Sequence, residues 1–274
     1  MSESVFATPR NVRDVSECIF YHTMDLPGIG EVQGQFDLRG REAVYLGNVD
    51  LDGKRVLEVG PANGHLSLYM ERQGAEVVSC DLSKDISWDF VPYARVDHDA
   101  MIETVRGGID RINNGYWLAH RLHESRNRVV YSSVYDIPDA IGRFDVGTLC
   151  ATLLHMENPF RAIESVARRT RDKIVITEIL GPRNFLSYQL SRWFRPAMRF
   201  LPNAREPLSW NGHLTPDRIE RCMVWWTLTP DVIRRFLGVV GFERSDLRYH
   251  RQSYQGRKLV SCTVVGHRTV PLAD

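Results

Sequence analysis

The sequence predicts a doubly wound α/β fold built on a mostly parallel seven-stranded sheet. Three observations support this: five short apolar runs alternate with helical segments, the first run ends at a glycine, and the carboxyl end has a hairpin pattern. The five runs are 54–60, 75–80, 128–134, 144–150 and 173–179. Strands of this length separated by helical segments pair in parallel through right-handed crossovers.

Local signals place the remaining elements. Helices are expected after Gly64 and from about Asn158, where apolar residues recur at helical spacing. Thr229 is a typical N-cap of a closing helix, because a proline follows it. Two extended runs, at 246–254 and 258–267, flank a Gln-Gly turn and predict an antiparallel hairpin, which completes the seven strands.

Two stretches exceed a minimal sheet of this kind. Residues 86–127 are expected to add helices, for example at 100–112. Residues 182–228 carry apolar residues at helical spacing with arginines on the other face, which predicts a helical lid over the carboxyl ends of the strands. The expected organisation is an amino-terminal cap segment (1–50), a ligand-binding core (51–181), the lid insertion (182–228), and a closing helix and hairpin of the same sheet (229–274).

Composition excludes several classes of protein. The 35 Lys and Arg against 34 Asp and Glu give a net charge of +1, unlike the basic balance of a dedicated nucleic-acid binder. No apolar run approaches the roughly 20 residues of a membrane span, and the first residues lack a signal-peptide pattern. The five cysteines are scattered without a C-x-x-C pair, and no metal-ligand spacing occurs. We therefore expect a cytoplasmic enzyme without a metal.

The segment LEVGPANG, residues 57–64, is the most informative part of the sequence. A strand ends at Glu58-Val59-Gly60, and a helix begins after Gly64. Glycines at both positions, with the small Ala62 between them, let the backbone approach a ligand, and the free N–H groups of a helix start favour an anionic group. Asp81 ends the second strand, where a carboxylate can accept hydrogen bonds from both hydroxyls of a ribose. The two features together predict a site for a nucleoside with a negatively charged end.

The residue sequence of this loop distinguishes between two kinds of nucleotide cofactor. The dinucleotide fingerprint G-x-G-x-x-G is absent. The E-x-G-x-x-x-G of Glu58, Gly60 and Gly64 instead resembles motif I of the class I S-adenosylmethionine-dependent methyltransferases. This resemblance implies S-adenosylmethionine as the cofactor. It also implies that the glycine loop faces the amino-acid end, that Glu58 acts near the methionine amino group, and that Asp81 binds the ribose.

Further segments resemble other motifs of this family. Residues 132–138 resemble the loop that meets adenine, and residues 150–160 resemble the active-site motif that follows the fourth strand. The resemblance implies four further cofactor-lining residues: Ser133, Val134, Tyr135 and Cys150. Trp88 follows the acidic strand end, where it would either stack on adenine or belong to the core.

The segments 21–26 and 34–39, together with 70–77 and 87–89, narrow the resemblance. They are similar to the methyltransferases grouped with the tRNA wobble-uridine carboxymethyl-transfer enzymes. The similarity covers roughly residues 20–180, and a weaker similarity is found at residues 225–226 and in the final helix. This group defines a fold and a cofactor far better than an acceptor.

Three residues are candidates for the chemistry at the methyl group. His155 follows the fourth strand, and a histidine with a pKa of about 6.5 suits a general base; the alternative is a histidine that only shapes the pocket. Glu178, at the end of the fifth strand, would orient an acceptor or pair with an arginine of the insertion. His22 is a third candidate if the amino-terminal segment covers the pocket.

The arginines and aromatic residues of 182–228 leave the acceptor open. They suit a lid around a small acceptor, an RNA-facing patch, a helix on a membrane surface, or an ordinary helix packed on the core. The near-neutral charge favours a small organic acceptor attacked at O or N. The alternatives are methyl or carboxymethyl transfer to RNA, with Arg39 or Arg41 as the extra cation, and a non-catalytic nucleoside-binding module. The sequence does not determine the acceptor or the oligomeric state.

Overall fold

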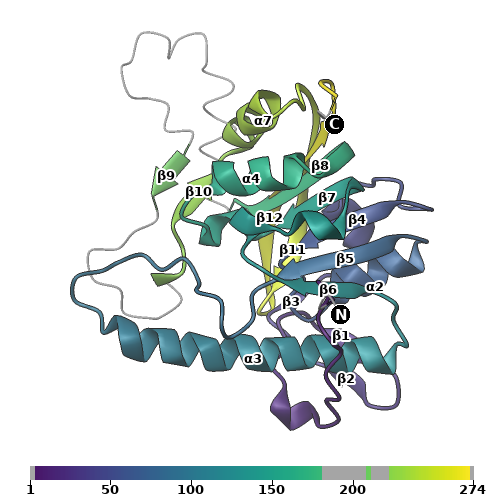
Figure 1. Ribbon diagram of the computed structural model, residues 1–274, viewed down its shortest axis with the longest axis vertical. Helices are drawn as coiled ribbons and strands as arrows, with labels where there is room; N and C mark the ends of the chain where they lie inside the picture. The colour runs from purple at the N-terminus through teal and green to yellow at the C-terminus, as the bar shows by residue number, and fades with distance from the viewer. Residues whose placement is uncertain (1–3, 181–207, 211–221, 272–274) are drawn as a thin grey trace.

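A computed structural model describes residues 4–180, 208–210 and 222–271, and it contains an eight-stranded sheet (Figure 1). The strand order is β3-β11-β12-β8-β7-β4-β5-β6. The doubly wound α/β class is confirmed. The strands are β3 (Phe36–Asp37), β4 (Arg55–Val59), β5 (Glu76–Asp81), β6 (Arg128–Tyr131), β7 (Phe144–Cys150), β8 (Thr170–Ile179), β11 (Arg244–Tyr254) and β12 (Arg257–His267).

The five central strands are parallel and reverse their winding beside β4. The chain runs outward from β4 to β5 and β6, then returns to the other side of β4 with β7 and β8. Val59 is in register with Cys80 on one side and with Leu149 on the other, so the carboxyl ends of the three strands meet at one edge. Such a switch point is where open α/β sheets bind their ligands.

The antiparallel side of the sheet has one strand more than the sequence predicted. The hairpin of β11 and β12 forms around Gln255 and Gly256, as expected, and β12 pairs with β8. The additional strand, β3, comes from the amino-terminal segment and pairs with the last residues of β11. The seven-strand prediction missed it because two residues are too few to show an alternating pattern. Tertiary packing forms it instead, with the Phe36 and Tyr254 rings 4.6 Å apart.

Helices cover both faces of the sheet. Buried residues of α4 (Pro159–Ala167) and α7 (Pro230–Val239) form one core cluster with Leu57, Val59 and Leu149. Both helices start at the predicted caps: the Asn158 side chain accepts from Arg161 N–H, and the Thr229 hydroxyl accepts from Val232 N–H. On the opposite face, α1 (Glu42–Tyr45) and α2 (His65–Arg72) pack in a second cluster.

Helix α3 (His98–Leu122) is longer than the helix predicted at 100–112. It crosses the molecule beside β6 and extends beyond the sheet (Figure 1). Its carboxyl half is buried in a third cluster with β1 (Met24–Leu26) and β2 (Gly30–Val32) of the amino-terminal segment. The four successive residues from Tyr116 to Ala119 are all buried, so this part of α3 lacks the alternation of apolar and polar residues by which a helix is predicted. Tertiary packing stabilises these additional turns.

Most of the expected lid, residues 181–207 and 211–221, lies outside the described residues. Two described pieces of the 182–228 stretch are strands β9 (Leu208–Trp210) and β10 (Trp226–Leu228), which pair antiparallel. Across the described part of the chain, no helix is both long enough and apolar enough to span a bilayer.

Substitution of Gly147 tests how tightly the central sheet is packed. A Cβ at this position of β7 would lie 2.5 Å from Val166 Cγ1 and 2.7 Å from Thr170 Oγ1. Gly147→Ala should lower the free energy of unfolding by about 1–3 kcal/mol in urea titrations, as overpacked cores do. Gly238→Ala is the matched control, since nothing lies within 4 Å of a Cβ there. An equal effect of both substitutions would contradict this account of the packing.

Candidate functional site

The loop between β4 and α2 forms the floor of the candidate site. Gly60 leaves the strand with φ +71°, and its N–H donates to Cys80 O at 2.9 Å. Ala62 and Gly64 also have positive φ, and α2 begins directly after Gly64. The Thr152 methyl fills the space beside Gly60, because a Cβ there would lie 2.6 Å from Thr152 Cγ2. Glycine is therefore required at position 60 both for the turn and for the close approach of the β7 loop.

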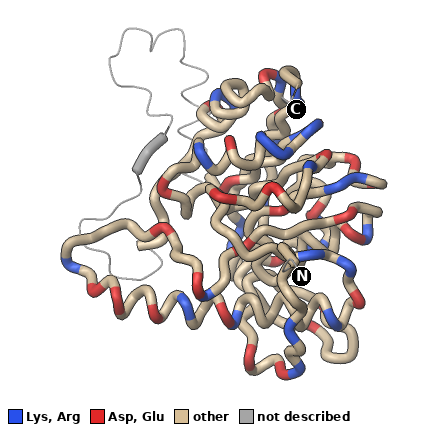
Figure 2. The backbone as a smooth tube through the Cα atoms, viewed as in Figure 1, with Lys and Arg blue, Asp and Glu red and all other residues tan. Residues whose placement is uncertain are grey.

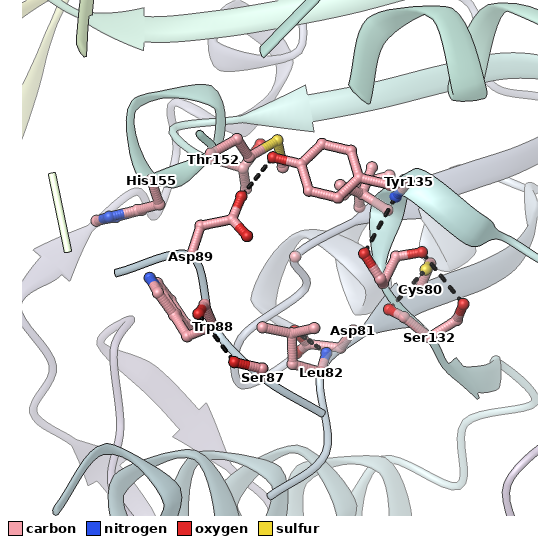
Figure 3. Close-up of a pocket in the computed structure, with 15 residues that line it drawn as sticks. Cys80, Asp81, Leu82, Ser87, Trp88, Asp89, Ser132, Tyr135, Thr152 and His155 are labelled. Carbon is pink, nitrogen blue, oxygen red and sulfur yellow. Dashed lines mark hydrogen bonds between the residues drawn. The ribbon is translucent and has the colours of Figure 1, made fainter. Parts of the chain in front are cut away.

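A cavity of about 100 Å³ opens above this loop, at the carboxyl ends of β4, β5, β6 and β7 (Figure 3). It lies at the switch point of the sheet. It brings together seven of the residues that the sequence assigned to the site: Gly60, Asp81, Trp88, Ser133, Val134, Tyr135 and His155. Its other lining residues are Val59, Cys80, Leu82, Ser87, Asp89, Ser132, Thr152 and Met156.

Asp81 supplies the carboxyl group of the cavity. Its Oδ1 accepts from Leu82 N–H at 2.8 Å, which orients the side chain and leaves Oδ2 available to a ligand. Burial, with a smaller contribution from the nearby Glu58 carboxyl, raises the pKa of Asp81 to about 7. A carboxylate held at a strand end in this way can accept hydrogen bonds from two neighbouring hydroxyls.

A hydrogen-bond network around Asp89, which the sequence did not predict, forms one wall of the cavity. Asp89 Oδ2 accepts from the Tyr135 hydroxyl and, at 2.8 Å, from Glu157 N–H, while the Tyr135 hydroxyl accepts from Asn158 N–H at 3.1 Å. The indole N–H of Trp225 donates to Asp89 O at 3.0 Å. Figure 3 shows Asp89 and Tyr135 facing each other across the top of the cavity. Asp89 thus joins the segment after β5 to the loops after β6 and β7.

Trp88 and His155 line the cavity beside Asp89 (Figure 3). Their rings meet edge to face with centroids 5.4 Å apart. His155 Nδ1 lies 2.7 Å from Met223 O, which assigns the ring proton to Nδ1 and leaves Nε2 as the acceptor nitrogen. Burial lowers the pKa of His155, so the ring is neutral near pH 7.

Other predicted cofactor residues lie outside this lining. Glu58 is buried behind the loop, where it accepts from the hydroxyls of Ser67 and, at 3.0 Å, Ser79. Burial raises the pKa of Glu58 to about 7. Ala62 and Gly64 shape the loop and start α2 without lining the cavity. Glu58 therefore does not line the cavity, and its action near the methionine amino group, directly or through water, stays a prediction.

Cys150 faces away from the cavity, and strand geometry explains why. Leu149 packs in the cluster beneath α4, whereas Cys150, the next residue, packs in the cluster of α1 and α2 on the opposite face. Successive side chains of a strand alternate between its two faces. The expectation that Cys150 lines the cofactor rested on its place at the start of the active-site motif, and the cavity lining does not include it.

Glu178 and His22 lie beyond the cavity, on the side of β7 and β8. Glu178 Oε1 accepts from Leu153 N–H at 3.0 Å and so holds the loop that carries His155. Burial raises the pKa of Glu178 to about 8. The His22 ring lies 5.7 Å from the His65 ring, and burial lowers the pKa of His22 to about 3. The structure does not bring His22 to the cavity.

Comparison with known proteins identifies the family. A family model described as a methyltransferase domain matches residues 38–223, which is more than half of the chain. The chain therefore belongs to this methyltransferase family. No curated protein matches the sequence.

Solved structures resemble this chain at low sequence identity. The amino-terminal domain of EvdMO1, crystallised with S-adenosylhomocysteine and D-fucose, is 16% identical, with a TM-score of 0.52 over 93% of this chain and 92% of that one. Magnesium protoporphyrin IX methyltransferase from Synechocystis PCC 6803, with bound S-adenosylhomocysteine, is 14% identical, with a TM-score of 0.49 over 83% of this chain and 80% of that one. Identities this low speak for the fold alone.

The Asp81 carboxyl predicts a pH dependence of ligand binding. Ribose hydroxyls donate to an ionised carboxylate, and a group with a pKa near 7 is protonated below that pH. Affinity for S-adenosylhomocysteine should therefore be roughly tenfold weaker at pH 6 than at pH 8, measured by calorimetry. Asp81→Asn should remove this dependence, and Asp85→Asn, an exposed control outside the cavity, should keep it. A dependence that survives Asp81→Asn would assign the titration to another group.

Proposed function

We propose that the protein transfers a methyl group from S-adenosylmethionine to an oxygen or nitrogen atom of a small organic acceptor. The observation that carries this proposal is the cavity at the switch point, where Asp81 and the Gly60 turn converge with Ser133 and Val134. These residues suit an adenosine: a carboxylate for the ribose hydroxyls, a small polar edge for the base and a close backbone approach. The methyltransferase family match is independent support.

The backbone and the charge of the site suit this cofactor. The cavity lies where two left-handed residues, Gly60 and Ala62, bring the backbone close to the ligand. The buried carboxyl groups of Asp81 and Glu58 are hydrogen-bonded by neutral groups, Leu82 N–H for Asp81 and two serine hydroxyls for Glu58, which suits a ligand that carries positive charge. Bound S-adenosylmethionine would supply a methyl group on a positively charged sulfur. The remaining work is to align an acceptor and to accept its proton.

His155 is the general base in this proposal. The Met223 carbonyl fixes the Nδ1 proton, so Nε2 is the basic nitrogen, and the low pKa keeps it unprotonated. Nε2 would accept the proton of the acceptor oxygen or nitrogen as that atom is methylated. Glu178 has a supporting role: it holds the His155 loop through Leu153 N–H and lies on the acceptor side.

A small acceptor and plain methyl transfer are favoured over an RNA acceptor and carboxymethyl transfer. Basic and acidic residues are interspersed along the described chain, as Figure 2 shows. Carboxymethyl transfer needs a cation for the extra carboxylate. Arg39 was a candidate, but it pairs with Asp25, Glu31 and Asp37. All five cysteines are free thiols, which suits a reducing cytoplasm.

Calorimetry and mass spectrometry test the proposed cofactor. The purified protein should bind both S-adenosylmethionine and S-adenosylhomocysteine, and Asp81→Ala should weaken both by roughly tenfold or more, since a charged hydrogen-bond acceptor is lost. Mass spectrometry of any co-purified nucleoside identifies the branch: a carboxylated S-adenosylmethionine would indicate carboxymethyl transfer. The absence of heat with either compound would reject the proposal.

The base is tested by His155→Ala, assayed with an acceptor that yields S-adenosylhomocysteine as product. Turnover should fall by roughly tenfold or more, because the proton loses its acceptor, while cofactor affinity stays within a factor of about two. His123→Ala is the control, since His123 lies outside the cavity and its ring nitrogen contacts Asp25 O. Unchanged turnover of His155→Ala would remove His155 from the mechanism.

A further inference from the structure

Asn63, in the middle of the β4–α2 loop, connects three parts of the molecule. Its Oδ1 accepts from Tyr21 N–H of the amino-terminal segment. Its Nδ2 donates to Ile19 O at 2.6 Å and to Ile112 O of α3 at 3.2 Å. The side chain has no solvent-exposed area, so these hydrogen bonds satisfy its oxygen and both of its N–H groups.

Helix α3 is shaped to admit this side chain. Gly115 lies against Asn63, and a Cβ at that position would clash with Asn63 Nδ2 and lie 3.0 Å from Ile19 O. Gly107, on the same helix, has nothing within 4 Å of a Cβ. The requirement for a small residue is therefore local to the Asn63 contact. A fully bonded amide in a tailored space indicates a specific linkage, since loss of any one partner would leave a buried polar group unpaired.

The segment that Asn63 holds lies against the core cluster of α1 and α2. Tyr21 packs against this cluster, which includes Tyr45, and so do Cys150 and Ile179, the last residues of β7 and β8. The Thr177 hydroxyl donates to Tyr45 O at 2.7 Å, which fixes Tyr45 beside β8. The residues proposed to bind adenosine lie on the other side of the switch point, on β5 and in the loop after β6. A ligand that spans the β4 loop would therefore direct its reactive end toward Tyr21.

We propose that Asn63 is a positioning residue that transmits the order of the occupied cofactor loop to Tyr21 and the segment around it, which forms the acceptor side of the active site. Asn63 itself touches neither reactant. It acts through Tyr21 N–H and Ile19 O, so that the loop and the acceptor side become ordered together. This inference rests on the proposed function, because it requires S-adenosylmethionine or its product to occupy the loop.

Amide hydrogen exchange, followed residue by residue by NMR, tests this linkage with S-adenosylhomocysteine as the probe. The Tyr21 amide reports directly on the Asn63 bond, and the Thr23 amide, which donates to Phe36 O at 2.7 Å, is an internal control. In the wild-type protein, the probe should slow exchange at Tyr21 by roughly tenfold or more and leave Thr23 nearly unchanged. A purely structural Asn63 would give the same Tyr21 exchange with and without the probe.

Two variants and one control complete the test. Asn63→Ala and Gly115→Ala should bind the probe within a factor of about three of wild type, yet lose the probe-dependent protection at Tyr21. Gly107→Ala should behave as wild type. If Asn63→Ala fails to fold, Gly115→Ala still displaces the amide from outside the cofactor loop. Probe-dependent protection that persists in Gly115→Ala, or heat of binding without any change at Tyr21, overturns this inference alone. The absence of heat in calorimetry overturns the proposed function with it.

Discussion

The reversal of the chain between β4 and α2 is the constraint on which the rest of the site depends. β4 lies between two parallel strands in the middle of the sheet. After its last residue, Val59, only five residues remain before α2 begins at His65, so the chain must turn sharply. Left-handed conformations at Gly60, Ala62 and Gly64 make this possible. The same turn brings backbone N–H groups to the switch point, positions Asn63 between the amino-terminal segment and α3, and leaves room for the Thr152 methyl. Binding site and covering segments thus share one loop.

The ionisable groups around this loop are buried with few compensating charges. Burial raises the pKa of Glu58 and Asp81 to about 7 and that of Glu178 to about 8, and it lowers the pKa of His155. Burial thus favours the uncharged form of each of these groups over an unpaired buried charge. A ligand with a positive centre would shift the carboxyl groups toward their ionised forms. Electrostatics and geometry thus favour the same kind of cofactor.

The sequence predicted the parallel strands closely, because each is a short apolar run bounded by a turn or a helix. It also predicted the side chains that follow directly from a strand end, such as Asp81 and His155. It did not predict Asp89, whose partners Tyr135 and Glu157 lie 46 and 68 residues away and share no local pattern with it. The sequence places Asn63 in the glycine loop, but its hydrogen-bond partners could not be predicted, because they belong to two distant segments.

The sequence by itself determined the winding of the sheet, the position of the turn after β4 and the class of ligand that this turn suits. These follow from residue periodicity and from the backbone freedom of glycine, which act over a few residues. Only the tertiary structure decided which side chains reach the cavity: the alternation of β7 turns Cys150 away, and Ser67 and Ser79 hold Glu58 behind the loop. It also decided that β3 joins the sheet and that α3 extends to Leu122. Those outcomes depend on contacts between distant segments, and such contacts leave no regular spacing in the chain.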